Sequence, residues 1–264
     1  MEQEYGRKID IRRKKILDLL TQDGQVRVSQ LSKILDTTMV TIRSDLDALE
    51  KEGYLERTQG GAIQTVKNAY NLEFQHRKQY NIVPKNIIAE KTASLVHDGE
   101  TLFMNSGTTT YLTAVHLKRL RNLNIVTNSI SIALELGSFP TFRVLLLGGE
   151  INAQYSFVYG ADAQEQLRKY KADKTILSMD GICPDAGLTT YHAEEVQIDR
   201  LMIERARETI ITADHTKFSH ESFSFVADLS QVNSWVTDHC EEKNKQKLIA
   251  SGIEVFNCEN IEIE

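Results

Sequence analysis

Beyond Pro84, the chain alternates regularly between short apolar runs and segments with the periodicity of an α-helix. The apolar runs cover residues 101–104, 125–127, 144–147, 175–179, 209–212, 235–237 and 254–256. Helical patterns cover residues 85–97, 110–118, 130–137, 160–169, 193–207 and 241–250. Strands that are apolar on both faces must be covered on both faces. The alternation therefore predicts an α/β fold, with a mainly parallel sheet between two layers of helices.

The N-terminal quarter of the chain has a different pattern, with three short helical segments followed by two β-prone runs around a polar tip. The first segment spans about residues 7–21, and the second starts near Ser29, which favours an N-cap. Thr38 can cap the third, which is stopped by Gly53, and the β-prone runs lie within residues 54–63. Three short helices followed by a hairpin are typical of a winged helix-turn-helix.

Residues 64–84 are polar with scattered aromatic side chains, and we interpret them as a linker. They would join a winged helix-turn-helix domain of residues 1–63 to an α/β domain of residues 85–264, sizes that are ordinary for globular domains.

No apolar run approaches the length of a membrane span, and the N-terminus is charged where a signal peptide is apolar. The three cysteines show no CxxC spacing, so we expect a reduced, cytoplasmic protein.

The charge is distributed unevenly along the chain, whose formal net charge is −6. Residues 1–62 hold 11 Lys/Arg and 11 Asp/Glu, whereas the remaining 202 residues hold 20 and 26. Within the neutral part there is a basic stripe made of Arg7, Lys8, Arg12, Arg13, Lys14 and Lys15. Such a stripe indicates either a contact with nucleic-acid phosphates or a solvated helix face.

The third predicted helix carries small polar side chains and a guanidinium in its N-terminal half. That end of a recognition helix enters the major groove, where Arg reads guanine and a Thr methyl contacts thymine. Two polar residues of the hairpin would follow the DNA backbone or the minor groove. The candidate DNA-binding residues are Thr38, Met39, Thr41, Arg43, Ser44, Arg57 and Gln59.

These segments resemble the DNA-binding half of DeoR-type bacterial repressors. The resemblance rests on the stretch TIRSDL, residues 41–46, and on RTQGGA, residues 57–62, which correspond to the start of the recognition helix and the end of the wing in that family. Ser44 stands where the family often has a second Arg, and Gln59 stands where it often has His. Because both residues face the expected DNA, the family's operator preference does not carry over.

In the α/β domain, the stretch NSGTTT, residues 105–110, follows the first predicted strand and precedes a helix. Backbone amides and hydroxyl groups converge at such a helix N-terminus, where the helix dipole favours an anion. The loop is therefore a candidate phosphate cradle, with a simple capped turn as the alternative. It is not a Walker A loop, because the glycine spacing and the lysine are missing. Asn128, after the second strand, either binds a ligand or caps the following helix.

Further loops at strand ends carry candidate ligand contacts. Gly148 and Gly149 allow a close backbone approach or a turn. Asp180 could hydrogen-bond a sugar hydroxyl or act as a base, and Lys217 could neutralise a phosphate, although a lone lysine is usually solvated.

The same loops extend the resemblance to nearly the whole chain. The stretches NSGTTT, VTNS, LLGGE, DGI, GLT, ADHTKF and VTD occur in the order found in the sensor domain of DeoR-type regulators. The resemblance implies a fold similar to ribose-5-phosphate isomerase and coenzyme A transferases, and a phosphorylated sugar or related metabolite as ligand. The effector-binding residues it implies are Asn105, Ser106, Gly107, Thr108, Thr109, Thr110, Asn128, Asp180, Gly181 and Lys217. Asn105 replaces an Asp that is common in the family.

A sugar-phosphate isomerase with an accessory DNA-binding domain is the alternative function. Enolisation needs a carboxylate beside the substrate carbon, and the related isomerase has an acid pair three and four residues after the Asp of its Asp-Gly motif. Here those positions hold Cys183 and Pro184, so we expect no enzymatic activity and no catalytic residues. The seven histidines show no ligand spacing, so we expect no metal site, and nothing indicates a cofactor.

Together, the two halves predict a sequence-specific regulator of transcription, a repressor of a carbohydrate-metabolism operon. It would bind double-stranded operator DNA as a homodimer or homotetramer, without a membrane partner. A phosphorylated sugar or related metabolite would change its affinity for the operator.

Overall fold

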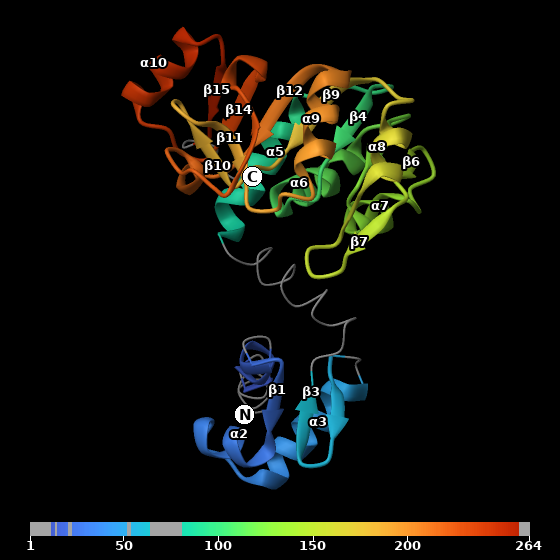
Figure 1. The fold of residues 1–264 in the computed structure, drawn as a ribbon, viewed down its shortest axis with the longest axis vertical. Helices are drawn as coiled ribbons and strands as arrows, with labels where there is room; N and C mark the ends of the chain where they lie inside the picture. Colours follow the sequence, from blue (N-terminus) through green and yellow to red (C-terminus); the bar gives the residue numbers. More distant parts are fainter. Residues whose placement is uncertain (1–11, 14, 21–22, 52–53, 64–80, 259–264) are drawn as a thin grey trace. The chain divides into compact units, whose positions relative to one another are not determined.

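The computed structural model describes residues 12–13, 15–20, 23–51, 54–63 and 81–258. They belong to two compact units whose main division lies between Arg77 and Lys78 (Figure 1). That division falls within the expected linker 64–84, of which residues 64–80 lie outside the described part of the chain. No helix in the described ranges combines the length and the apolar character that a bilayer crossing requires.

The N-terminal unit is a small helical bundle with a three-stranded antiparallel sheet of order β1-β3-β2. Residues 12–13 and 15–20 are helical. The elements that follow are β1 (Gln25–Arg27), α2 (Val28–Ile34), α3 (Met39–Lys51), β2 (Glu56–Thr58) and β3 (Gly61–Ile63). Ile16, Leu20, Leu31, Ile42 and Leu46 are almost fully buried in its core. The described parts of all three predicted helices and the hairpin are present, as a winged helix-turn-helix requires.

The start of α2 differs from the prediction. The helix begins at Val28, and its N-cap is Arg27, whose side chain makes no capping bond, so the expected cap at Ser29 was wrong. The backbone N–H of Val28 instead donates to the carbonyl of Gly60 at 2.9 Å. The hairpin therefore satisfies a helix-terminal donor that a capping side chain would otherwise bond. The expected cap at Thr38 is confirmed, since its Oγ1 accepts from the N–H of Thr41 at 3.1 Å.

Two glycines allow the hairpin to close against β1, a strand that the sequence pattern did not predict. Gly60 has φ +102°, a conformation that side chains strongly disfavour. A Cβ on Gly61 would lie 2.0 Å from the carbonyl oxygen of Val26. Gly53, the expected end of the third helix, lies outside the described residues, and α3 extends to Lys51.

The C-terminal unit is built on a seven-stranded sheet of order β15-β14-β12-β9-β4-β5-β6, in which every neighbouring pair is parallel. The strands are β4 (Thr101–Met104), β5 (Asn124–Thr127), β6 (Arg143–Leu146), β9 (Ala172–Leu177), β12 (Ala206–Thr212), β14 (Ser234–Thr237) and β15 (Glu254–Asn257). Each corresponds to one of the seven predicted apolar runs. The predicted parallel α/β fold is confirmed.

Helices cover both faces of this sheet (Figure 1). They are α5 (Ile82–Ser94), α6 (Thr108–His116), α7 (Ile130–Leu136), α8 (Ala161–Leu167), α9 (Val196–Arg205) and α10 (Glu242–Ala250). Phe103 of β4 packs in one cluster with residues of α8 and α9. Its equally buried neighbours Leu102 and Met104 point to the opposite face, because side chains alternate along a strand.

Two small antiparallel sheets lie outside the predicted pattern. One has the order β10-β11-β13 and the other pairs β7 with β8. Their strands are β7 (Glu150–Asn152), β8 (Phe157–Tyr159), β10 (Gly181–Cys183), β11 (Gly187–Thr190) and β13 (Ser224–Ala227). They are three or four residues long and several are polar, so they lack the apolar signal that marked the central strands.

Candidate functional site

The central sheet reverses its strand order between β4 and β9. From β4 the sheet continues to β5 and β6, whereas from β9 it continues to β12, β14 and β15. Loops that leave neighbouring parallel strands in opposite directions open a crevice at the carboxyl edge, where ligands bind in this class of fold. The loop after β4 is the predicted cradle, residues 105–110, and the loop after β9 begins at Ser178.

Asn105 holds these two loops together. Its Oδ1 accepts from the backbone N–H of Ser178 at 3.0 Å and from Thr110 Oγ1 at 3.1 Å. Its Nδ2 donates to the carbonyl of Ser178 at 3.0 Å and to Asp199 Oδ1 at 3.2 Å. The oxygen and the nitrogen of this buried amide therefore both form hydrogen bonds within the protein. Asn105 holds the cradle loop against the loop that begins at Ser178.

The cradle leads directly into α6, whose N-cap Gly107 makes no side-chain capping bond. A Cβ on Gly107 would lie 2.1 Å from Ser178 Cβ, so the close packing of the loops requires glycine. The N–H of Thr110 donates to Ser178 Oγ at 3.2 Å. In the described part of the chain, the backbone amides and hydroxyl groups of Thr108 and Thr109 donate no hydrogen bond. These donors lie where the dipole of α6 favours an anion.

Asn128 does not cap a helix, because Ser129 does so: Ser129 Oγ accepts from the N–H of Ile132 at 3.3 Å. The Nδ2 of Asn128 donates instead to Glu195 Oε1 at 3.0 Å. The same carboxylate oxygen accepts from Ser106 Oγ at 2.7 Å. Three loops thus meet at Glu195, which precedes α9.

Asp199 lies one turn further along α9 and is 1% exposed. Burial raises the pKa of Asp199 well above its usual range, and the nearby charges of Glu195 and Asp180 raise it further. The hydrogen bond from Asn105 opposes this shift, because it stabilises the ionised form. The described site therefore contains buried acidic groups beside hydrogen-bond donors.

Asp180 and Lys217, which the resemblance placed among the effector-binding residues, lie close to each other. Asp180 Oδ2 accepts from the N–H of Tyr191 at 2.9 Å and from Thr190 Oγ1 at 3.3 Å. Its Oδ1 lies 3.8 Å from Lys217 Nζ, and both side chains are more than a third exposed. Gly181 starts β10, where a Cβ would lie 2.3 Å from the carbonyl oxygen of His220.

Three residues of this site were missed from the sequence, namely Ser178, Glu195 and Asp199. Ser178 lies inside the predicted apolar run 175–179, although the observed strand β9 ends at Leu177, and it belongs to no recognisable motif. Asp199 had a detectable signal, because it shares the buried side of α9 with Val196 and Ile203. A carboxylate at a buried position of an amphipathic helix requires a specific partner or a functional reason.

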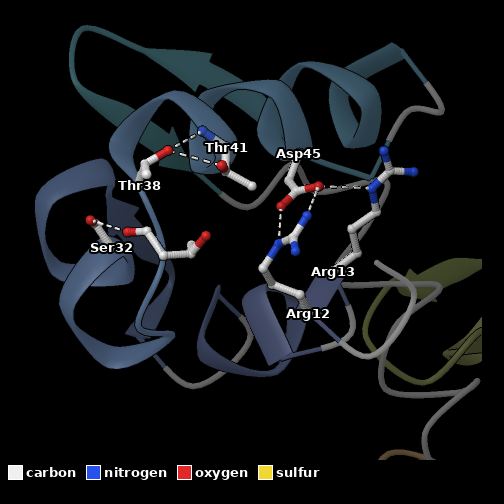
Figure 2. A network of polar contacts seen from close by, with 7 residues as sticks. Arg12, Arg13, Ser32, Thr38, Thr41 and Asp45 are labelled. Carbon is white, nitrogen blue, oxygen red and sulfur yellow. Dashed lines mark hydrogen bonds and ion pairs between the residues drawn. The ribbon is translucent and has the colours of Figure 1, made fainter. Parts of the chain in front are cut away.

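In the N-terminal unit, the first half of α3 presents the predicted polar face. Met39, Arg43 and Ser44 are exposed, whereas Thr38 and Thr41 are joined by a 2.9 Å contact between their Oγ1 atoms (Figure 2). Gln59 is exposed at the turn between β2 and β3.

Two arginines of the basic stripe pair with a buried carboxylate. Arg12 contacts Asp45 through Nε at 2.5 Å and Nη2 at 3.1 Å, and Arg13 Nε lies 3.3 Å from the same group (Figure 2). The side chain of Asp45 is only 4% exposed. These two arginines therefore join the first helical segment to α3 and are not part of a freely solvated face.

Arg57 connects the hairpin to α3. Its guanidinium donates to the carbonyls of Gly61 at 3.1 Å and Arg43 at 3.3 Å, and it pairs with Asp47. The backbone N–H of Arg57 also donates to Glu50 Oε1 at 2.8 Å. These bonds hold the wing against α3, whereas the side chain of Arg43 is exposed.

Two family models match this chain. Residues 12–67 match a DeoR-like helix-turn-helix domain, and residues 80–239 match the DeoR C-terminal sensor domain. The chain belongs to the DeoR family of transcriptional regulators. The predicted family is confirmed, and the winged unit and the parallel α/β unit are its helix-turn-helix and sensor domains.

Curated members of the DeoR family match most of the chain. It is 33% identical to the HTH-type transcriptional repressor GlcR of Bacillus subtilis, over 84% of this chain and 86% of that protein. It is 32% identical to the glycerol-3-phosphate regulon repressor of Haemophilus influenzae, over 89% of this chain and 91% of that repressor. The HTH-type transcriptional repressor CsqR of Escherichia coli is 29% identical, over 93% of this chain and 94% of that protein.

Solved structures match less closely. Ribose 5-phosphate isomerase from Plasmodium falciparum is 17% identical, with a TM-score of 0.38 over 51% of this chain and 52% of the isomerase. The eIF2B β subunit from Chaetomium thermophilum is 12% identical, with a TM-score of 0.44 over 85% of this chain and 62% of that subunit. Both scores are low, so neither likeness bears on what this DeoR-family regulator binds.

Proposed function

We propose that this DeoR-family regulator represses a carbohydrate-metabolism operon in the cytoplasm, and that a phosphorylated sugar or related metabolite changes its affinity for the operator. The observation that carries the proposal is the cradle, which presents the N-terminus of α6 at the reversal point of the parallel sheet. The relatives add support, since one is named as the repressor of a glycerol-3-phosphate regulon.

On the DNA side, α3 is the recognition helix and enters the major groove with its N-terminal half. Arg43 and Ser44 are exposed there, beside Met39, and each would contact base edges. Thr38 and Thr41 shape the start of the helix and offer methyl groups to thymine. Gln59 would contact the DNA backbone or the minor groove from the wing. Homodimers or homotetramers would place two such helices on paired half-sites.

On the effector side, the anionic group would bind at the start of α6. The amides and hydroxyls of Thr108 and Thr109 are the donors, and they lie at the positive end of the helix dipole. Gly107 allows the close approach of the cradle loop to Ser178, and Thr110 anchors that loop. Lys217 lies 3.8 Å from Asp180, and we propose that it turns to the anion when the effector binds.

The protein is proposed to act without catalysis. Cys183 and Pro184 stand where the rival isomerase mechanism needs carboxylates. The sugar-phosphate isomerase is tested because of Asp199, since a buried carboxyl group of raised pKa is a common general base. Isomerisation of any pentose or hexose phosphate that disappears in the Asp199→Asn variant would establish the enzyme instead.

The proposal is tested by removing hydroxyl groups from the cradle. An operator is first selected from a random duplex library with the purified wild-type protein, and sugar phosphates are then screened for release of, or tighter binding to, that duplex. The double variant Thr108→Ala/Thr109→Ala should bind the selected duplex as the wild type does but lose the response by at least about tenfold in effector concentration.

The matched control is Ser138→Ala/Thr141→Ala, which removes two exposed hydroxyls before β6, at the opposite edge of the sheet. It should retain the full response. A response that survives in the cradle variant would place the anion elsewhere, and a wild-type protein that selects no duplex at low salt would refute the proposed regulator.

A further inference from the structure

Asn128 and Glu195 form a group of hydrogen-bond acceptors beside the cradle, which we call the acceptor cluster. Asn128 is 0% exposed, yet its Oδ1 has no hydrogen-bond partner in the described part of the protein. Buried polar atoms are nearly always paired, so an unpaired one at a candidate site needs an explanation. Its Nδ2 bond to Glu195 Oε1 holds the amide in this orientation.

The carboxylate of Glu195 is held in place just as firmly. Its Oε1 accepts both from Ser106 Oγ and from Asn128 Nδ2, at 2.7 and 3.0 Å. The group is 5% exposed and lies at the N-terminus of α9, where the helix dipole favours negative charge. In both of these bonds Glu195 is the acceptor, so in this arrangement the group presents acceptor oxygens to the site.

The site therefore has two chemically opposite ends. The start of α6 offers donors to an anion, whereas the acceptor cluster offers acceptors, which an anion cannot satisfy. A ligand that satisfies both ends carries an anionic group at one end and hydroxyl donors at the other. Inorganic phosphate or a simple phosphate monoester satisfies only the first end.

We propose that Asn128 and Glu195 recognise hydroxyl groups of the effector, and that they select a polyhydroxylated phosphate ester over an anion without hydroxyls. This inference rests on the proposed effector function of the cradle. A ligand hydroxyl donates to Asn128 Oδ1 and completes the pairing of that buried amide. A neighbouring hydroxyl donates to the Glu195 carboxylate, and Ser106 keeps the carboxylate in position. The acceptor cluster thus determines specificity, while the cradle supplies the anion contact.

The test compares two kinds of probe on the full-length protein. Methyl phosphate is an anion without hydroxyls, and the polyhydroxylated panel consists of glycerol 3-phosphate, glucose 6-phosphate, fructose 6-phosphate and fructose 1-phosphate. Dissociation constants come from calorimetric titration, supported by ligand-dependent shifts in melting temperature. In the wild type, at least one member of the panel should bind more tightly than methyl phosphate by at least about tenfold.

Glu195→Gln removes the charge but keeps an oxygen for Ser106 and Asn128. Because an amide nitrogen cannot accept from a hydroxyl, this variant should lose the preference for the polyhydroxylated probe. Its affinity for methyl phosphate should stay the same or rise, since a negative charge has been removed. Glu194→Gln is the matched control: it makes the same charge change one residue earlier, on an exposed side chain, and should behave as the wild type does.

Asn128→Ala provides a second route if Glu195→Gln does not fold, as judged by its melting transition without probe. It removes the unpaired acceptor and should also reduce the preference for the polyhydroxylated probe.

Three outcomes overturn the inference. If the panel binds both acceptor-cluster variants with the wild-type preference, the cluster is structural and the proposed function survives. If Glu195→Gln strengthens the binding of both kinds of probe equally, Glu195 competes with the anion for donors and recognises no hydroxyl. If no probe binds the wild-type protein, the proposed effector function fails and the inference fails with it.

Discussion

Each of the two domains buries a carboxylate, but only one of these carboxylates is paired with positively charged side chains. Asp45 in the helix-turn-helix domain is 3% exposed, and Asp199 in the sensor domain is 1% exposed. Asp45 contacts the guanidinium groups of Arg12 and Arg13. Asp199 accepts a hydrogen bond from the neutral amide of Asn105. Burial and two nearby carboxyl groups raise the pKa of Asp199.

The difference indicates that Asp45 stabilises the fold of its domain, whereas Asp199 belongs to a binding site. A buried charge that is fully paired holds helices in one arrangement, and removing one partner leaves the other uncompensated. A buried charge without a counter-ion costs stability, and proteins place such groups where a ligand or a reaction uses them. The DNA-binding domain is therefore built for a fixed shape, whereas the sensor domain keeps unbalanced polar groups at its crevice.

The largest effect is expected from Asp45→Ala. Removing this carboxylate breaks the ion pairs of Asp45 with Arg12 and Arg13, and breaking a buried pair costs about 3–5 kcal/mol. Circular dichroism of the full chain should show early melting of the helix-turn-helix domain. Fluorescence of Trp235, the single tryptophan of the chain, should report an unchanged sensor transition.

Asp47→Ala is the control for that experiment, because Asp47 carries the same charge on the same helix but its side chain is 66% exposed. Its loss should cost about 0–1 kcal/mol. Equal destabilisation by the two variants would show that the pairing of Asp45 has no special structural role.

A smaller effect is expected on DNA binding, from the loss of Arg43, whose side chain is exposed while that of Arg57 is paired. Arg43→Ala should weaken binding to the selected operator by about 1–3 kcal/mol if its guanidinium reads a base. Its matched control is Arg168→Ala on the sensor domain, where an exposed guanidinium is also removed. A mobility-shift titration that gives wild-type affinity for Arg43→Ala would remove this residue from the interface.

Much of this architecture could be predicted because it depends on simple periodic signals. The seven apolar runs all became strands of the parallel sheet, since burial on both faces requires continuous apolar sequence. The cap at Ser29 was mispredicted for a physical reason: the carbonyl of Gly60, more than thirty residues away, bonds the N–H of Val28 in place of a side chain. Local sequence carries no sign of such a contact.

The candidate site was predictable only in part. The cradle could be found because its small residues are contiguous and precede a helix. Glu195 could not, because its role depends on bonds from Ser106 and Asn128, which follow two different strands. The role of Arg57 was also hidden, since a basic residue in a hairpin gives no indication that its guanidinium bonds the carbonyl of Arg43.

The smallest predicted effect concerns the pH dependence of the sensor domain. Because the pKa of Asp199 is raised in the folded state, the folded protein binds this proton more tightly than the unfolded chain does. Stability from this group is therefore complete below the ordinary pKa and is lost as the pH rises toward the raised one. Asp199→Asn keeps an oxygen for the amide of Asn105 and carries no charge, so it should stabilise the sensor domain at neutral pH.

Denaturant unfolding followed by Trp235 fluorescence between about pH 5 and pH 8 measures this difference. The gain of Asp199→Asn over the wild type should grow with pH, because only the wild-type carboxyl pays for ionisation. Asp185→Asn, which changes an exposed aspartate, should show no such growth. A constant difference across the range would mean that Asp199 is ionised throughout and that a counter-charge balances it, as the two arginines balance Asp45.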